Sequence, residues 1–434
     1  MLGHWLNSGV NLPVLCTPFI RFSLAYHRPV PVPCTMPKPP LNPAATESPR
    51  QSGTGSKLAA WQLADLRFLV VLLAPVSVLL SVWLSPASAG LKSVAIYMLV
   101  VAVDALWPGA QRSPQPVPTV ATSRYFIGLI RLYVPLQLAV QISAGWVAWH
   151  SSWPTVLGLA LSVGILSGAL GITIAHELGH SPRRLDRIMA WVLMTSVFYA
   201  HFMVEHYRGH HPRAATFDDP ATARRGESLW HFLRRSLRNS LVHAWQLEGR
   251  RLQQLKRGWG RSPLVWVFTA KAVFLLVLIL AMALPLLVFC MLQSLIAVTL
   301  LEAVNYIEHY GLLRRGKDSR RIRQSDNERT DWRLGRREPF GPMHAWNADH
   351  VFTNSLLINL QRHSDHHINP WKSYADLVHL GASPQLPTGY AGCILLAMVP
   401  SLWFAVMNPR LGQAKAYFQP DEVLTQPGVV SDLS

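Results

Sequence analysis

The segment HELGHSPRRLDRIMAWVLMTSVFYAHFMVEHYRGHH, residues 176–211, decides the fold because its apolar middle could be taken for a membrane span. A span over residues 188–204 would put the histidines of HELGH and those of EHYRGHH on opposite faces of the membrane. The roughly 25 residues between the two groups cannot cross and return, because each crossing takes about 20 residues. If both groups serve one site, this segment must lie in the membrane interface or dip into it.

The rest of the chain supplies six candidate spans, of which residues 94–107 are short unless Leu91 is included. Four precede the segment, at residues 68–84, 94–107, 125–149 and 153–175. The run at residues 264–304 is about twice as long as one span and has Pro285 at its middle, which predicts two spans joined by a tight turn. The apolar stretch 390–407 contains Pro400 and is predicted to lie at the interface or to pack on the rest of the domain. The sequence therefore predicts an all-α integral membrane protein with six transmembrane helices.

The composition agrees with a membrane protein. Half of the 434 residues are hydrophobic and only 15% are charged, which is low for a soluble protein. The formal net charge of +17 would suit either a nucleic-acid-binding protein or a membrane protein with basic loops on one side. The apolar content favours the membrane and argues against a nucleic-acid partner. Lys and Arg concentrate in the connections 108–124, 205–262 and 313–338, so the positive-inside rule places these connections and the N-terminus in the cytoplasm.

Composition also divides the chain into three regions. Residues 1–56 are rich in Pro, Ser and Thr and are predicted to form a disordered extension, because they cannot bury a core. Residues 57–412 are predicted to form the membrane domain and residues 413–434 a C-terminal tail. The four cysteines form no C-x-x-C pair, which excludes a zinc ribbon, a fused rubredoxin and a thioredoxin-like motif.

Nine histidines in four groups carry the chemistry. HELGH places His176 and His180 at i and i+4 on one helix face, a spacing that suits two ligands of one metal and that is also typical of a zinc protease helix. EHYRGHH repeats this spacing at His206 and His210 and adds His211. NYIEHYG (305–311) contributes one histidine at the end of the sixth span, and RHSDHH (362–367) contributes three. Because every group follows a span or lies in a cytoplasmic segment, packing is a poor explanation for nine imidazoles at one membrane face.

The number of histidines indicates how many metal ions, and of which kind, the site would bind. Nine imidazoles exceed what one metal can bind, so two metals are predicted, and imidazole suits iron, copper, zinc or nickel. A zinc protease binds one metal through three protein ligands, which counts against that function. Two irons in an all-nitrogen shell with open positions suit the activation of O2. The neighbouring carboxylates are predicted to fix ring orientation by accepting the free imidazole N–H, with direct ligation as the alternative; they are Glu177, Glu205, Glu308 and Asp365.

These motifs resemble the signatures of the membrane-bound non-haem di-iron alkane 1-monooxygenases, or alkane ω-hydroxylases. The resemblance rests on HELGH, EHYRGHH, NYIEHYGLLR and LQRHSDHH, supported by FDDPATARRGES (217–228), HAWNADH (344–350) and PQLPTGYA (384–391). It covers roughly residues 60–412. NYIEHYG separates this family from the membrane desaturases and sterol hydroxylases. One departure is Ser181, where the family usually has lysine, but this position is not a ligand.

The resemblance implies six spans around a cytoplasmic di-iron site in the bacterial inner membrane. It implies O2-dependent terminal hydroxylation of n-alkanes, with electrons from rubredoxin and its NAD(P)H-dependent reductase. No catalytic residue is expected beyond the implied ligands of the two iron ions, which are His176, His180, His206, His210, His211, His309, His363, His366 and His367. The alternatives are a hydroxylase of xylene or other alkyl aromatics and a fatty-acyl desaturase or hydroxylase. A His-rich metal transporter would instead place its ligands near the bilayer midplane.

An apolar slot between the spans is expected to hold the alkane. A terminal C–H bond has no polar handle, so the protein must supply position and dryness to the metal chemistry. Bulky residues would set the depth of the slot, with Trp83, Tyr97 and Trp107 as candidates. The basic stretches RRSLR (234–238) and GRRLQQLKRGWGR (249–261) would attract an acidic rubredoxin, although positive-inside topology explains them equally well.

Overall fold

The computed structural model describes residues 63–107, 120–314 and 338–418. The predicted extension at residues 1–56 lies outside the described residues, and so does the part of the predicted tail beyond Phe418. The described ranges are helical and contain no β-strand, which confirms the all-α prediction. The last helix, α15 (Pro400–Phe418), crosses the boundary that we predict at residue 412.

Six helical stretches are long and apolar enough to cross a membrane, as predicted. These candidate spans are Leu66–Leu84, Pro86–Leu106, Arg124–Trp149, Trp153–His180, Pro263–Leu280 and Leu284–His309. They correspond to α1 (Val70–Leu84), α2 (Ala89–Leu106), most of α3 (Val120–Trp149), α4 (Trp153–Leu166) together with α5 (Ile172–His180), α10 (Pro263–Leu280) and α11 (Leu284–His309). Pro285 stands in the first turn of α11, where its missing N–H breaks no helical hydrogen bond, so the turn between the last two spans falls just before it.

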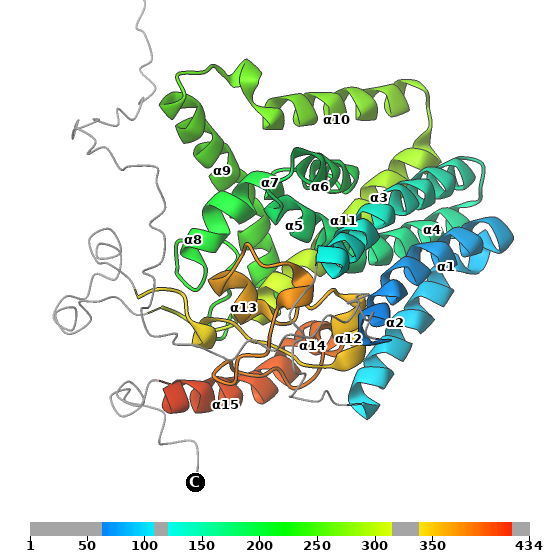
Figure 1. The fold of residues 1–434 in the computed structure, drawn as a ribbon. Coiled ribbons are helices and arrows are strands. Elements are labelled where there is room, and N and C mark those ends of the chain that lie inside the picture. The colour runs from blue at the N-terminus through cyan, green and yellow to red at the C-terminus, as the bar shows by residue number, and fades with distance from the viewer. Residues whose placement is uncertain (1–62, 108–119, 315–337, 419–434) are drawn as a thin grey trace, which may run out of the picture. The chain divides into compact units, whose positions relative to one another are not determined.

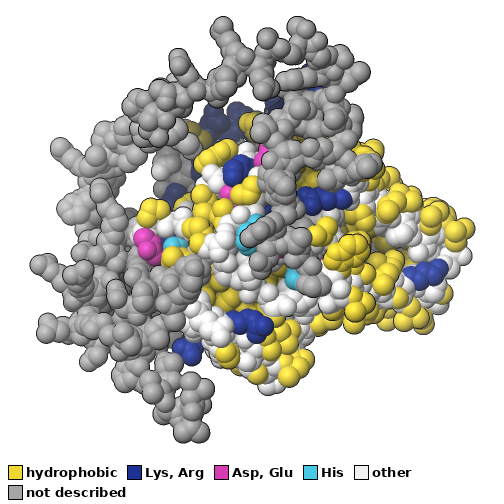
Figure 2. All heavy atoms as spheres, turned by 60° about the horizontal axis from the view of Figure 1, so that its bottom comes forward, with side chains coloured by type: hydrophobic (Ala, Val, Ile, Leu, Met, Phe, Trp, Pro, Cys, Tyr) yellow, Lys and Arg dark blue, Asp and Glu magenta, His cyan; other side chains and the backbone are white. Residues whose placement is uncertain are grey.

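Small residues bring the spans close together. A Cβ atom on Gly168 would lie 2.9 Å from Cα of Ala297, and one on Gly90 would lie 2.9 Å from Cα of Gly158. Glycine therefore lets the fourth span approach both α11 and α2, as small residues commonly do between membrane helices. Figure 1 shows α1 to α4 and α11 side by side, with α10 at the edge of the bundle. Apolar side chains gather over the right-hand part of the molecule in Figure 2, where α1 to α4 lie.

The segment between the first two histidine motifs dips into the bundle and does not cross it. It forms α6 (Arg184–Ser196), a turn, and the short helix α7 (Phe202–Glu205). At the turn, Gln141 of α3 donates a hydrogen bond to the Ser196 hydroxyl (3.0 Å), and Gln293 of α11 donates one to its carbonyl (3.0 Å). These amides hold the tip of the dip between two spans, so the segment returns on the side from which it entered, as predicted.

The C-terminal third packs against the ends of the spans. It contains α12 (Val351–Leu356), α13 (His363–Ile368), α14 (Tyr390–Ala397) and α15. The apolar stretch 390–407 falls in α14 and α15, neither of which is a candidate span. Trp403 is fully buried, with its ring 5.3 Å from that of Tyr306 on α11. The prediction that this stretch packs on the domain is therefore confirmed.

Candidate metal centre

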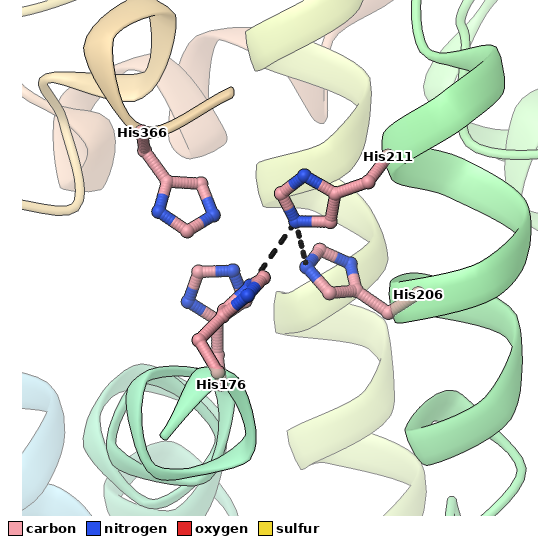
Figure 3. Close-up of side chains that lie close together, drawn as sticks. His176, His206, His211 and His366 are labelled. Carbon is pink, nitrogen blue, oxygen red and sulfur yellow. Dashed lines mark hydrogen bonds between the residues drawn. The ribbon is translucent and has the colours of Figure 1, made fainter. Parts of the chain in front are cut away.

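All nine predicted ligands come together in two groups. Group 1 consists of His176, His180, His206, His211 and His366, and group 2 of His210, His309, His363 and His367. Within each group the candidate ligand atoms lie within 4.8 Å of one another. Figure 3 shows the rings of His176, His206, His211 and His366 of group 1, which come from segments far apart in the sequence and point toward one another. The two groups match the predicted number of metals.

Both groups are assembled from the ends of helices. The fourth span ends in α5, which carries His176 and His180, and the sixth span ends at His309. The π-helical turn η4 (His206–His210) follows α7, and α13 carries the last motif. Since histidines on both sides of the dipping segment share group 1, a span over residues 188–204 is excluded.

The spacing of the ring nitrogens fits metal coordination. Nε2 of His211 lies 3.1 Å from Nε2 of His180 and 3.0 Å from Nε2 of His206. In group 2 the Nε2 pairs are His367–His363 at 2.9 Å, His210–His367 at 3.1 Å and His363–His309 at 3.2 Å. Nitrogens about 2.1 Å from one metal ion and at right angles to each other lie about 3.0 Å apart. A cation bound between these lone pairs would account for a convergence that neutral rings alone would resist.

Two further nitrogens of group 1 have no hydrogen-bond partner. Nε2 of His176 and Nε2 of His366 are buried and make no hydrogen bond within the described residues, although buried polar atoms normally make one. Burial, followed by the neighbouring imidazoles, holds the pKa values of His366, His206 and His211 well below the usual range. The rings are therefore neutral, with lone pairs available to a metal. The residues of both groups thus fit a pair of histidine-bound metal ions.

The π-helical turn η4 sends adjacent histidines to different groups. In an α-helix His206 and His210 would share a face, as their i, i+4 spacing indicates. A π-helical turn closes i→i+5 hydrogen bonds, so His206 aligns with His211, and both join group 1. His210 joins group 2. This pairing differs from the one that the spacing suggests, and the local backbone distortion is its physical cause.

Two buried carboxylates contact outer ring nitrogens of group 2. Oε1 of Glu308 lies 3.2 Å from Nδ1 of His363, but the two atoms form no hydrogen bond, so Glu308 stands beside the ring without accepting its N–H as predicted. Oδ2 of Asp219 lies 2.9 Å from Nδ1 of His210, so the Nδ1–H donates to it and Nε2 is left to face the metal. Sequence reasoning missed Asp219. Its only signal was a place within the family-like stretch 217–228.

The other three predicted orienting carboxylates contact groups outside the ligand set. The contacts are Glu205 with Nδ1 of His243 (3.0 Å), Glu177 with the backbone N–H of Tyr374 (3.1 Å) and Asp365 with the ammonium of Lys372 (2.9 Å). These contacts join α9 (Leu229–Gln254) and the loop after α13 to the histidine motifs. The structure therefore corrects the prediction for these three side chains, which hold surrounding segments and not the ligand rings.

The electrostatics of Asp219 keep it ionised and fixed. Burial alone would raise its pKa, but the neighbouring His210 holds that pKa below the usual range. For His210, burial alone would lower the pKa, and the Asp219 carboxylate raises it. Thr222 donates its hydroxyl to Oδ2 (2.6 Å), and the backbone N–H of Ala221 donates to Oδ1 (3.1 Å). The carboxylate is thus unable to turn away from His210.

Replacing Asp219 with Asn is expected to weaken metal binding in group 2 by about 10–100-fold, because an amide no longer holds His210 with its proton on Nδ1. Metal analysis of the purified variant should give close to half of the wild-type iron content. Asp186→Asn is the matched control, since this carboxylate is also buried but accepts hydrogen bonds from Arg131 and Ser181 instead of a ligand ring. An unchanged iron content in Asp219→Asn would show that His210 is oriented without this carboxylate.

An apolar cavity of about 290 Å3 leads from the metal centre into the bundle. His176, His206 and His363 line it at the metal end. Ser93 and Ser162, whose hydroxyl oxygens are 2.7 Å apart, line it at the other end. Because Ser162 precedes His176 by four turns of nearly continuous helix, the cavity is about 20 Å long.

The cavity opens on the side of α1 and α2. Leu73 and Ile96 line it and are 65% and 48% exposed, so an apolar molecule can enter from the lipid-facing surface. Of the three bulky candidates from the sequence, Tyr97 lines the cavity. Trp83 and Trp107 are 58% and 70% exposed and lie outside the lining.

Comparison with known proteins agrees with this geometry. Residues 151–397 match the family model described as fatty acid desaturase. Alkane 1-monooxygenase 2 of Pseudomonas aeruginosa is 39% identical over 335 residues, which cover 75% of this chain and 84% of that protein. Alkane 1-monooxygenase of Ectopseudomonas oleovorans is 36% identical, covering 78% of this chain and 83% of that protein. The xylene/toluene monooxygenase hydroxylase component XylM of Pseudomonas putida is 28% identical, covering 59% and 64%.

Proposed function

The chain belongs to the alkane 1-monooxygenase family, and we propose that it hydroxylates n-alkanes at the terminal carbon with two iron ions bound by groups 1 and 2. One atom of O2 enters the alkanol, and the other leaves as water after the uptake of two electrons and two protons. The observation that carries this proposal is the cavity, which joins histidines of both groups to an opening on the lipid-facing surface.

The histidines supply nitrogen ligands, and iron bound there would supply the oxidising chemistry that a methyl C–H bond requires. The chain itself positions the substrate. The cavity holds an extended alkane with one end against His176 and His206, while apolar side chains of α1, α2 and α4 exclude water. Asp219 keeps the proton of His210 on Nδ1, which directs Nε2 of that ring inward, and Glu308 lies beside Nδ1 of His363.

The proposed function includes the source of the electrons and the orientation of the helix bundle in the membrane. Electrons come from rubredoxin, which is reduced by its NAD(P)H-dependent reductase. The histidine end of the bundle faces the cytoplasm of the bacterial inner membrane, because the Lys- and Arg-rich connections join the spans at that end.

Product analysis in whole cells tests the proposed function. Cells that express the chain with rubredoxin, in iron-replete medium, are given n-alkanes from pentane to hexadecane and, separately, p-xylene. We expect 1-alkanols from the alkanes. A preference for p-xylene with little 1-alkanol would favour the activity named for the relative from Pseudomonas putida. The double variant His363→Ala/His367→Ala is the control for conversion by the host.

Filling the far end of the cavity is expected to shorten the alkane range. In Ser162→Phe the new ring occupies the end farthest from His176, so the longest alkanes can no longer place a methyl group at the metals. Each CH2 that loses its place in the cavity costs about 0.8 kcal/mol, or about fourfold in relative rate. Product distributions from mixed alkanes measure this effect. Ser162→Ala is the control, and a Ser162→Phe variant that loses short and long substrates equally would contradict the predicted position of the chain.

A further inference from the structure

We propose that electrons enter the metal centre at the exposed edge of His180 and His211, and that the arginines around this edge bind the acidic electron carrier. This inference rests on the proposed function and adds to it the docking surface. We define the arginine rim as Arg183, Arg184, Arg187, Arg213 and Arg314.

The exposure of the ligands selects the point of electron entry. Seven of the nine histidines are buried, including all four of group 2. His180 and His211 are half-buried, and both belong to group 1. Their Nε2 atoms are 3.1 Å apart, so the two rings form one continuous edge from the surface to the site. Electron tunnelling slows steeply with distance, so the shortest path from a docked protein passes through this edge.

Backbone contacts fix parts of the rim next to the two rings. Arg187 donates to the carbonyls of Ser181 (3.0 Å) and Pro182 (2.6 Å), directly after His180. Arg314 donates to the carbonyl of Pro212 (2.7 Å), directly after His211. These hydrogen bonds hold positive charge on both sides of the exposed edge.

The acidic residue nearest to the rim in sequence interacts with Arg183 but forms its direct ion pair with an arginine outside the rim. Asp186 is fully buried and is paired with Arg131 on α3 at 2.7 Å. Arg183, Arg184 and Arg187 are exposed at the start of α6. A positive surface around a redox-active ligand fits a carrier protein with acidic groups around its own redox centre. In each encounter the reduced carrier gives up one electron and leaves oxidised, so two encounters supply one turnover.

The rim also differs from the basic stretches that stand out in the sequence. RRSLR lies on α9, a helix that carries none of the nine ligands. Arg234 and Arg238 are exposed there, which makes them a matched control for charge without proximity to a ligand edge. Arg183 stands at the N-terminus of α6, where a negative side chain interacts favourably with the helix dipole. A change from Arg to Glu at this position is therefore expected to leave the helix intact.

Binding of an acidic rubredoxin to the iron-loaded protein in nanodiscs of zwitterionic lipid tests the docking surface. For Arg183→Glu/Arg184→Glu we expect Kd to rise by about 10–100-fold at low salt. The difference should largely disappear near 0.5 M salt, where the Debye length is only a few ångströms. Arg234→Glu/Arg238→Glu should stay within about twofold of wild type.

Three results would overturn the inference. Equal weakening by both pairs would assign docking to the whole basic surface, and greater weakening by the control pair would assign it to α9. If rubredoxin binding is unchanged but adsorption to anionic vesicles is lost, the rim binds the lipid surface and not the electron carrier.

Chemical reduction with dithionite delivers electrons without a docked carrier protein. If wild-type protein that is first reduced with dithionite without O2, freed of dithionite and then given O2 forms no alkanol, the proposed function fails. The comparison of rubredoxin affinities still decides on the surface.

Discussion

Replacing His309 with alanine is expected to lower the rate of alkanol formation by more than about 100-fold and to remove close to half of the bound iron. His309 is fully buried at the end of α11, and its Nε2 lies 3.2 Å from that of His363 in group 2. Group 2 has four imidazoles, one fewer than group 1, so the loss of one ligand leaves three. Metal analysis with alkanol quantification measures both effects.

The control for His309 is another buried histidine outside both groups. His344 is 2% exposed and accepts the backbone N–H of Gly341 at 2.8 Å. His344→Ala should retain the full iron content even if the protein becomes less stable. Retention of iron and activity by His309→Ala would show that His309 is structural, and group 2 would then need a different ligand set.

Replacing Gly179 with alanine is expected to destabilise the protein by about 2–3 kcal/mol and to disorder group 1, because a Cβ there would overlap the hydroxyl of Tyr207. Tyr207 fills the space between the first two histidine motifs. Its hydroxyl donates to the carbonyl of His176 at 3.0 Å, and its ring lies 4.6 Å from that of His180. Thermal unfolding in detergent, together with metal analysis, measures the effect.

A second substitution separates this clash from a general effect of alanine in a helix. The double variant Gly179→Ala/Tyr207→Ala should lose less unfolding free energy than the two single variants lose in total, because alanine at position 207 leaves no hydroxyl for the new Cβ to overlap. Gly128→Ala on α3 is the control, because a Cβ there meets no atom within 4 Å. A Gly179→Ala variant that melts like wild type would mean that Tyr207 can move away without cost.

The sequence was sufficient for the architecture because its strongest signals are local. Six apolar stretches, Pro285 between the last two, and the length of the dipping segment predicted the spans that the structure contains. The same segment length required the histidine motifs to meet at one face. The nine candidate ligands follow from these local patterns together with the family resemblance.

Contacts between distant segments could not be read from local patterns. The assignment of His210 to group 2 depends on the π-helical turn η4, which no residue type announces. The orienting role of Asp219 depends on the path of the chain after α8 (His211–Arg213), which returns this carboxylate to His210. Adjacency in sequence suggested Glu205 and Asp365 instead, but their side chains bind His243 and Lys372.

The way in which the ligands are spread along the chain orders the biosynthesis of the two metal groups. Four of the five group 1 histidines lie before residue 212, whereas group 2 has His210 alone until the sixth span ends at His309. The last motif, residues 363–367, then contributes two of the four ligands of group 2 and the fifth ligand of group 1. A ribosome-bound chain thus offers a nearly complete first pocket well before the second exists. Any metal captured during translation would therefore meet the histidines of group 1 before those of group 2 are complete.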